Sequence, residues 1–104
     1  MIWATTPEAD ADLIRGREWI EADNAEAGQQ FLRTARECFD RLGEFPELGP
    51  LARIKGREFE GVRFCLVSPP FNKWLIFYQV KATVEIIRVL YGVQNWRAEP
   101  KRFF

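Results

Sequence analysis

In this sequence, the side chains that could bind an anion or act on a substrate are mostly basic groups in the second half. Arginine and lysine stabilise the negative charge of a phosphate group or of an acidic partner, but arginine stays protonated and makes a poor base. Glu60, Tyr78 and Tyr91 are the candidate acids or bases, and carboxyl and phenol groups ordinarily titrate far from neutral pH. The candidate cations are Arg53, Lys55, Arg57, Arg63 and Arg88.

The sequence contains no histidine. This excludes Ser-His-Asp and Cys-His catalysis, histidine-ligated zinc and the usual general base of neutral pH. Cys38 and Cys65 are too few for a four-cysteine metal site, and they lie far apart in the sequence. We interpret both as small core residues, with a disulfide between them as the alternative. No metal and no cofactor is predicted.

Arg63 and Arg88 fall in segments with the pattern of strands, where a charged side chain is unusual unless it faces water or has a partner. Two interpretations stay open. Both could form ion pairs, Arg63 with Glu60 or Glu85, and Arg88 with a carboxylate of the first helix. Alternatively, both contact a target or a phosphate group. Tyr91 is interpreted as a packing or hydrogen-bonding residue.

Charge is distributed unevenly along the chain. The 104 residues carry 15 basic and 15 acidic side chains, and this balance argues against non-specific coating of nucleic acid. Residues 1–50, however, hold 5 basic and 11 acidic side chains, whereas residues 51–104 hold 10 and 4. The asymmetry indicates either solvated faces or a basic surface that meets an anionic partner. Likewise, Arg53, Lys55 and Arg57 form either a solvated loop or a track for phosphates.

Two helices are predicted in the first half, after a short strand over residues 2–5. The first begins at Thr5 or Thr6 beside Pro7 and continues to about residue 22, because apolar residues recur there with helical spacing. Asp23-Asn24 provides a break and a new N-cap. The second helix presents a broad apolar face and is predicted to end at Gly43. Such a short connection predicts an antiparallel helical hairpin.

The second half is predicted to consist of strands. After a loop over residues 44–56, the pattern changes to the two-residue period of a strand over 62–67. Residues 74–80 form a nearly continuous apolar run, which predicts a central strand covered on both faces, and residues 84–91 form the last strand. The order β-α-α-β-β-β predicts an α+β fold, with the helical hairpin packed on one face of a mostly antiparallel four-stranded sheet. The length predicts one domain, residues 1–104.

Aromatic residues supply much of the predicted core. In the tail, Trp96, Phe103 and Phe104 either fold back onto the sheet or lie in an interface with a partner protein or a second copy. The N-terminus lacks the pattern of a signal peptide, and no apolar run has the roughly 18 residues of a membrane span, so a cytoplasmic protein without membrane contact is expected. The aromatic residues predicted for the core are Trp3, Trp19, Phe31, Phe39, Phe64, Trp74 and Phe77.

Four segments carry a family resemblance: FPELGP over residues 45–50, GVRF over 61–64, LIFYQV over 75–80 and VEIIRVLYG over 84–92. The resemblance extends over essentially the whole chain, and the order and spacing of these segments together make it specific. On these segments the chain resembles the RelE/ParE superfamily of bacterial type II toxin–antitoxin toxins. The resemblance implies growth inhibition, a role in plasmid stabilization and a complex with a cognate antitoxin that wraps the toxin.

The family implies two mechanisms. RelE-like toxins cleave mRNA on the ribosome, which would make Arg63, Arg88 and Tyr91 the catalytic candidates. ParE-like toxins inhibit DNA gyrase without being nucleases. Tyr91 replaces a histidine common in the family, and Val93-Gln94-Asn95 replaces a segment that often holds Arg and Asp. Three observations favour the ParE-like mechanism: the absence of histidine, the neutral net charge and the VEIIRVLYG strand over residues 84–92. The third alternative is a degenerate toxin that retains only antitoxin binding.

Overall fold

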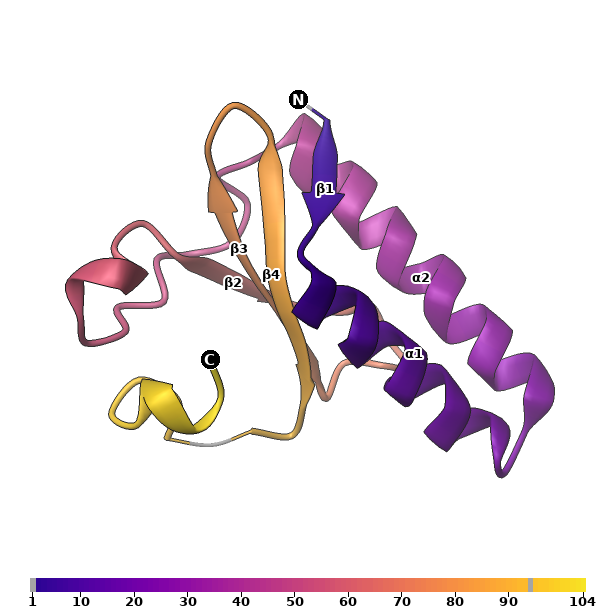
Figure 1. Cartoon of the computed structure of the whole chain (residues 1–104). Coiled ribbons are helices and arrows are strands. Elements are labelled where there is room, and N and C mark those ends of the chain that lie inside the picture. The colour runs from indigo at the N-terminus through magenta and orange to yellow at the C-terminus, as the bar shows by residue number, and fades with distance from the viewer. Residues whose placement is uncertain (1, 94) are drawn as a thin grey trace.

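The computed structural model describes residues 2–93 and 95–104, so the interpretation placed on Gln94 lies outside the described residues. Two helices cover one side of a sheet, and the C-terminal segment lies on the other side (Figure 1). The predicted α+β fold and the β-α-α-β-β-β order are confirmed. The elements are β1 (Trp3–Thr5), α1 (Pro7–Glu21), α2 (Ala25–Glu44), η1 (Arg57–Phe59), β2 (Arg63–Leu66), β3 (Trp74–Val80), β4 (Val84–Tyr91) and η2 (Pro100–Arg102), where η denotes a short 3-10 helix.

The four strands form one mixed sheet in the order β1-β4-β3-β2. The β2–β3 and β3–β4 pairs are antiparallel, whereas β1 pairs in parallel with β4 from Trp3↔Val84 to Thr5↔Ile86. This mostly antiparallel sheet agrees with the prediction. Because β1 has only three residues, β4 extends well beyond its neighbour on that side, and the rest of this edge of β4 needs other hydrogen-bond partners.

Side-chain caps fix where both helices begin. Thr6 accepts a hydrogen bond from the N–H of Ala9 at 3.1 Å, with Pro7 in the first turn, and Asn24 accepts one from the N–H of Ala27 at 3.1 Å. Gly43 was predicted to follow the last helical turn, but α2 continues to Glu44. Gly43 is therefore a buried residue of the last helical turn and does not end the helix.

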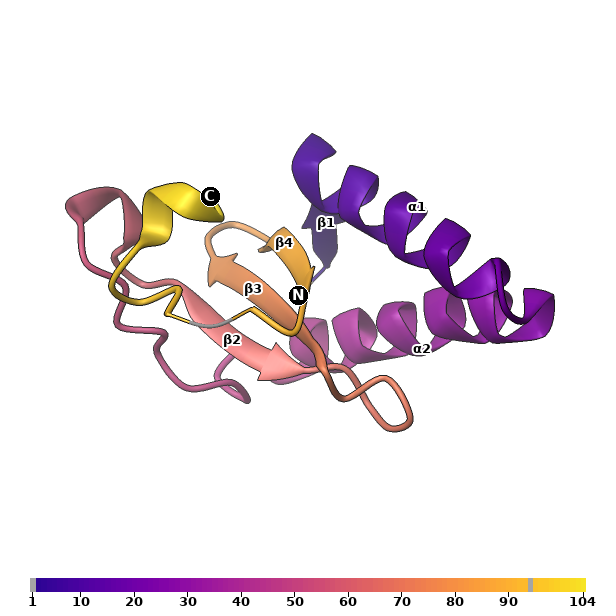
Figure 2. The same cartoon turned by 90° about the horizontal axis from the view of Figure 1, so that it is seen from below.

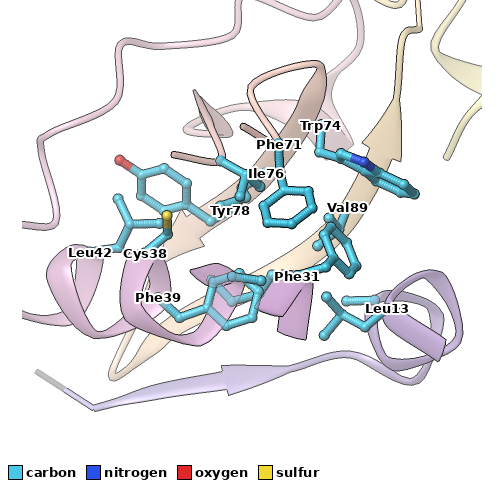
Figure 3. Close-up of a cluster of buried hydrophobic side chains, with 14 of the residues drawn as sticks. Leu13, Phe31, Cys38, Phe39, Leu42, Phe71, Trp74, Ile76, Tyr78 and Val89 are labelled. Carbon is cyan, nitrogen blue, oxygen red and sulfur yellow. The ribbon is translucent and has the colours of Figure 1, made fainter. Parts of the chain in front are cut away.

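The core on the helix side of the sheet is built from both helices and alternate residues of β3 and β4. Figure 3 shows Phe31 and Phe39 of α2 facing Ile76 and Tyr78 of β3. Gly16 lets α1 approach closely, because a Cβ there would lie 2.7 Å from the indole of Trp74. The predicted core positions Phe31, Phe39, Trp74 and Phe77 are buried, and Trp3 and Phe64 are half-buried.

The prediction that Trp19 lies in the core is wrong, because this residue is 60% exposed. Trp19 lies three residues after Gly16, which is the last buried residue of α1. Its ring packs edge-on against Tyr91, with centroids 5.1 Å apart, and against Trp74 at 6.5 Å. Neither helix of the described part has an apolar stretch suited to crossing a membrane.

A second cluster lies on the opposite side of the sheet. Phe77 is fully buried there between the rings of Trp96 and Phe104, each with its centroid 5.0 Å away. Phe104 also contacts Phe59 beside η1 at 5.6 Å. Strand β3 is therefore covered on both faces, as its nearly continuous apolar sequence predicted.

The two cysteines are free thiols, so the alternative of a disulfide does not apply. Burial raises the pKa of Cys65 from 9.0 to about 12. Because the unfolded thiol loses its proton above about pH 9 and the folded one does not, stability is expected to decline between about pH 9 and 12. The slope from this group is at most about 1.4 kcal/mol per pH unit.

Urea unfolding at pH 8, 9.5 and 10.5 measures this decline, with Cys65→Ser as the control that removes this thiol. At pH 8 the Cys65 thiol of the folded protein should also resist iodoacetamide and react once urea has unfolded the chain. Equal alkylation rates in the folded and unfolded chains would contradict the prediction.

Candidate functional site

Asp12 of α1 is the buried polar centre of the molecule. Its side chain is 3% exposed and accepts hydrogen bonds from three partners. The guanidinium of Arg88 donates through Nε at 2.7 Å to Oδ2 and through Nη2 at 2.9 Å to Oδ1. The N–H of Val89 donates at 2.9 Å, and Arg15 donates at 2.7 Å. The bidentate geometry makes this a strong, charge-assisted pair.

The place of Asp12 follows from the short first strand. Among the described residues, no strand pairs with this edge of β4 beyond Ile86, and the start of α1 takes over its hydrogen bonds. Thr6 donates through its backbone N–H to the Ile86 carbonyl at 3.0 Å and through its hydroxyl to the Ile87 carbonyl at 2.8 Å. Two residues further, Asp12 accepts from Val89. Helix α1 thus completes the sheet edge.

Arg88 also connects β4 to the C-terminal segment. Its Nη1 donates to the carbonyl of Phe103. The hydrogen bond to Asp12 raises the pKa of Arg88 further above its ordinary value, so the guanidinium stays charged. The structure therefore shows the ion pair between Arg88 and a carboxylate of the first helix that was one of the two interpretations of the sequence.

Tyr91 shares a surface hollow with Arg88. The hollow has a volume of about 310 Å³ and is lined by Asp12, Arg15, Trp19 and Trp74 in addition to these two. Tyr91 is 44% exposed, and its ring packs edge-on against Trp19 and Trp74, with both centroids 5.1 Å away. This is the packing role that its sequence position suggested.

Arg63 lies outside this hollow, and its side chain binds the loop that contains Gly49. It is paired with Tyr78 across the β2–β3 ladder, and its Nη1 donates to the carbonyl of Gly49 at 2.8 Å. The Tyr78 hydroxyl donates to the carbonyl of Pro46 and accepts from the N–H of Gly49. Burial raises the pKa of Tyr78, which keeps this donor protonated. These bonds fix the FPELGP segment; the ion pairs of the described residues do not include one from Arg63 to Glu60 or Glu85.

The three candidate nuclease residues therefore do not converge. Arg88 and Tyr91 line the hollow beside α1, whereas Arg63 lines a separate hollow of about 570 Å³ with Phe45 and Val80. No group of three or more His, Cys, Asp or Glu side chains within the described residues is placed to hold a metal ion.

Arg53, Lys55 and Arg57 extend into solvent from the segment before β2. Ala52 and Ile54, which alternate with them, are buried, so the alternation turns the cations outward. The described residues include no ion pair to any of the three.

The tail aromatics fold back onto the sheet, the first of the two alternatives considered for them. Trp96 is 6% exposed, and its ring packs against Phe64 at 5.1 Å as well as against Phe77. Phe103 and Phe104 are half-buried in the same cluster.

The sequence analysis did not identify Asp12, the carboxylate that binds Arg88, Arg15 and Val89. Asp12 occupies the same helical stripe as Ala9, Leu13 and Gly16, all of which are buried. A carboxylate within such a stripe, together with an arginine in a strand, was a signal that could have identified it.

The fold defines a class of protein: a helical hairpin on one face of a four-stranded sheet whose first strand pairs in parallel with the last. The chain belongs to the ParE toxin family of type II toxin–antitoxin systems, because the family model "ParE toxin of type II toxin-antitoxin system, parDE" matches residues 4–96. It is a toxin of this kind.

A solved structure has the same fold. The chain is similar to one described as "Chromosomal ParDE TA system from P. aeruginosa", with a TM-score of 0.58 and 16% identity, over 89% of this chain and 97% of that one. No curated protein matches the chain at a significant level.

Proposed function

We propose that this toxin arrests growth by binding DNA gyrase and inhibiting it without any chemistry of its own. The observation that carries the proposal is that the two arginines in the strands already have partners within the fold. Arg88 is held by Asp12 and the tail, and Arg63 by the loop at Gly49. Cleaving RNA needs an acid, a base and cations gathered at one phosphate. The candidates in this chain are divided between two hollows and have structural partners.

A cognate antitoxin is the second partner in this proposal, in a hetero-oligomer that neutralises the toxin in the cytoplasm. Its support is membership of a family defined by pairing with an antitoxin. The surface also has exposed apolar side chains of the kind that protein interfaces bury. They are Trp19 and Tyr91 beside α1, and Phe45, Leu48 and Val80 near the end of α2.

A supercoiling assay with relaxed plasmid and purified gyrase tests whether gyrase is the target of the toxin. Adding the purified toxin in increasing molar excess should progressively stop supercoiling, and in cells thymidine incorporation should fall before methionine incorporation. Intact supercoiling at large excess would contradict the proposal. Methionine incorporation failing first would indicate the ribosome-dependent mRNA endonuclease, and no change in either would indicate a chain that retains only antitoxin binding.

Tyr91→Phe separates inhibition by binding from nuclease chemistry. The variant keeps the ring that packs on Trp19 and Trp74 and removes only the hydroxyl. A toxin that acts by binding should retain its potency within about twofold. Loss of a catalytic acid or base typically lowers the rate by about 10²-fold or more. A comparable loss of toxicity in a folded Tyr91→Phe protein would favour the nuclease.

A further inference from the structure

One end of the molecule is a small basic lobe, made of residues 53–61 and 97–104. The two segments are far apart in the sequence but lie at the same end of the molecule (Figure 1), and Figure 2 shows η1 next to the C-terminal turn. The ring of Phe59 contacts that of Phe104, and the N–H of Lys55 donates to the carbonyl of Arg97 at 3.4 Å. Only the tertiary structure brings them together.

The lobe combines a positive charge with cations that have no acidic partner. It contains six basic and three acidic side chains, all of them exposed. Arg102 pairs with Glu99 at 3.2 Å, and Arg97 lies over the ring of Trp96 at 4.2 Å. Within the described residues, no ion pair involves the other four cations. These are Arg53, Lys55, Arg57 and Lys101.

Two of these cations face a shared hollow. Lys55 from the first segment and Lys101 from the second line a depression of about 380 Å³, together with Arg102, Glu58 and Glu99. Because Glu99 already pairs with Arg102, Glu58 is the carboxylate of the hollow that remains to offset the two lysines. The depression thus keeps an excess of positive charge.

None of the exposed large hydrophobic residues of the described chain lies within the lobe, whose own Phe59, Phe103 and Phe104 are half-buried. The exposed ones lie before β1, on α1, in the segment after α2 and at the ends of β2, β3 and β4. The core of a protein interface is apolar, whereas an interface with nucleic acid is polar and positively charged. The composition of the lobe therefore favours a phosphate backbone over an acidic protein.

The aromatic rings of the lobe favour double-stranded over single-stranded nucleic acid. Recognition of single strands depends on exposed aromatic faces on which unpaired bases stack. Here the three rings of the lobe, Phe59, Phe103 and Phe104, are half-buried in the cluster on this side of the sheet, and none is among the exposed large hydrophobic residues. Cations without a stacking platform fit the regularly spaced phosphates of a duplex.

We propose that the basic lobe is a contact surface for the phosphate backbone of duplex DNA, with Arg53, Lys55, Arg57 and Lys101 as the contacting cations. The surface is separate from the exposed apolar residues proposed for protein partners, so the toxin could hold DNA and a protein at the same time. Arg63 and Arg88, the other cations that the sequence suggested for phosphate contact, are held within the fold and do not belong to this surface.

Fluorescence anisotropy with a fluorescein-labelled 20-base-pair duplex tests the proposal at NaCl concentrations between 50 and 200 mM. Neutralising three or four phosphates should give a slope of about −3 in a plot of log affinity against log salt, because each contact contributes about −0.9. The double substitution Lys55→Gln with Lys101→Gln should reduce the magnitude of this slope by about 2.

The matched control is Arg33→Gln with Arg36→Gln. Both arginines lie on the exposed face of α2, no ion pair of the described residues involves them, and the change in net charge is the same. The control should keep the wild-type slope, with the circular dichroism of all variants unchanged. The proposal is overturned if the magnitude of the salt slope falls equally in both double variants. It is also overturned if a single strand of equal length binds more tightly than the duplex, or if polyglutamate binds and the duplex does not. Because no gyrase is present, the result is independent of the proposed gyrase inhibition.

Discussion

Asp12→Ala is expected to lower the free energy of unfolding by about 3–5 kcal/mol, since removing one member of a buried ion pair leaves the other without compensation. The guanidinium of Arg88, whose side chain is only 19% exposed, would lose both bonds to the carboxylate. The N–H of Val89 would lose its acceptor at the edge of β4. One substitution thus disrupts the junction of α1, β4 and the tail.

Urea unfolding followed by far-UV circular dichroism measures this loss. Glu18→Ala is the matched control, since this carboxylate is exposed on the same helix and should change stability by less than about 0.5 kcal/mol. If the cost comes from the uncompensated guanidinium, the double variant Asp12→Ala with Arg88→Met should recover much of it. A loss below about 1 kcal/mol in Asp12→Ala would show that the pair contributes little.

Trp96→Ala is expected to cost about 3–5 kcal/mol, the range of a large-to-small substitution of a buried aromatic residue. The indole is 6% exposed and packs against Phe64 and Phe77, so its removal leaves a cavity between the tail and the sheet. The adjacent Arg97 would also lose the ring over which it lies. Detachment of the tail would then expose the sheet face beneath it.

The matched control is Trp19→Ala, the same chemical change at a residue that is 60% exposed. It keeps the core intact and removes only edge-on ring contacts, so a cost of at most about 1.5 kcal/mol is expected. Both are measured by circular dichroism, because each substitution removes a fluorophore. If Trp96 served mainly as a partner contact, Trp96→Ala would leave stability unchanged and weaken capture of the antitoxin.

Local chemistry made most of the elements predictable. The caps at Thr6 and Asn24 and the change from a helical to a two-residue period are properties of neighbouring residues, and they located the helices and strands to within a few positions. The order of these elements then limited the topology, because a helical hairpin followed by consecutive strands has few ways to bury its apolar faces. The motifs over residues 45–92 indicated the family.

The role of each charged residue was decided by the tertiary structure. The sequence left two interpretations of Arg88 open. Asp12 is its partner because β1 is too short to cover β4, so that α1 lies against the uncovered edge of this strand. Arg63 acquired the Gly49 carbonyl as its partner through the path of the FPELGP loop. Neither pairing has a local signature, since the residues lie 76 and 14 positions apart.

The elements, the family and the uneven distribution of charge could be predicted from the sequence, because they depend on residue types and short-range spacing. The exposure of Trp19 and the packing of the tail on the sheet could not, and the fold established them. It also brought the cations of residues 53–57 beside those of residues 97–102. The physical reason is that burial and ion pairing depend on which distant surfaces come together, and packing, rather than local propensity, fixes that choice.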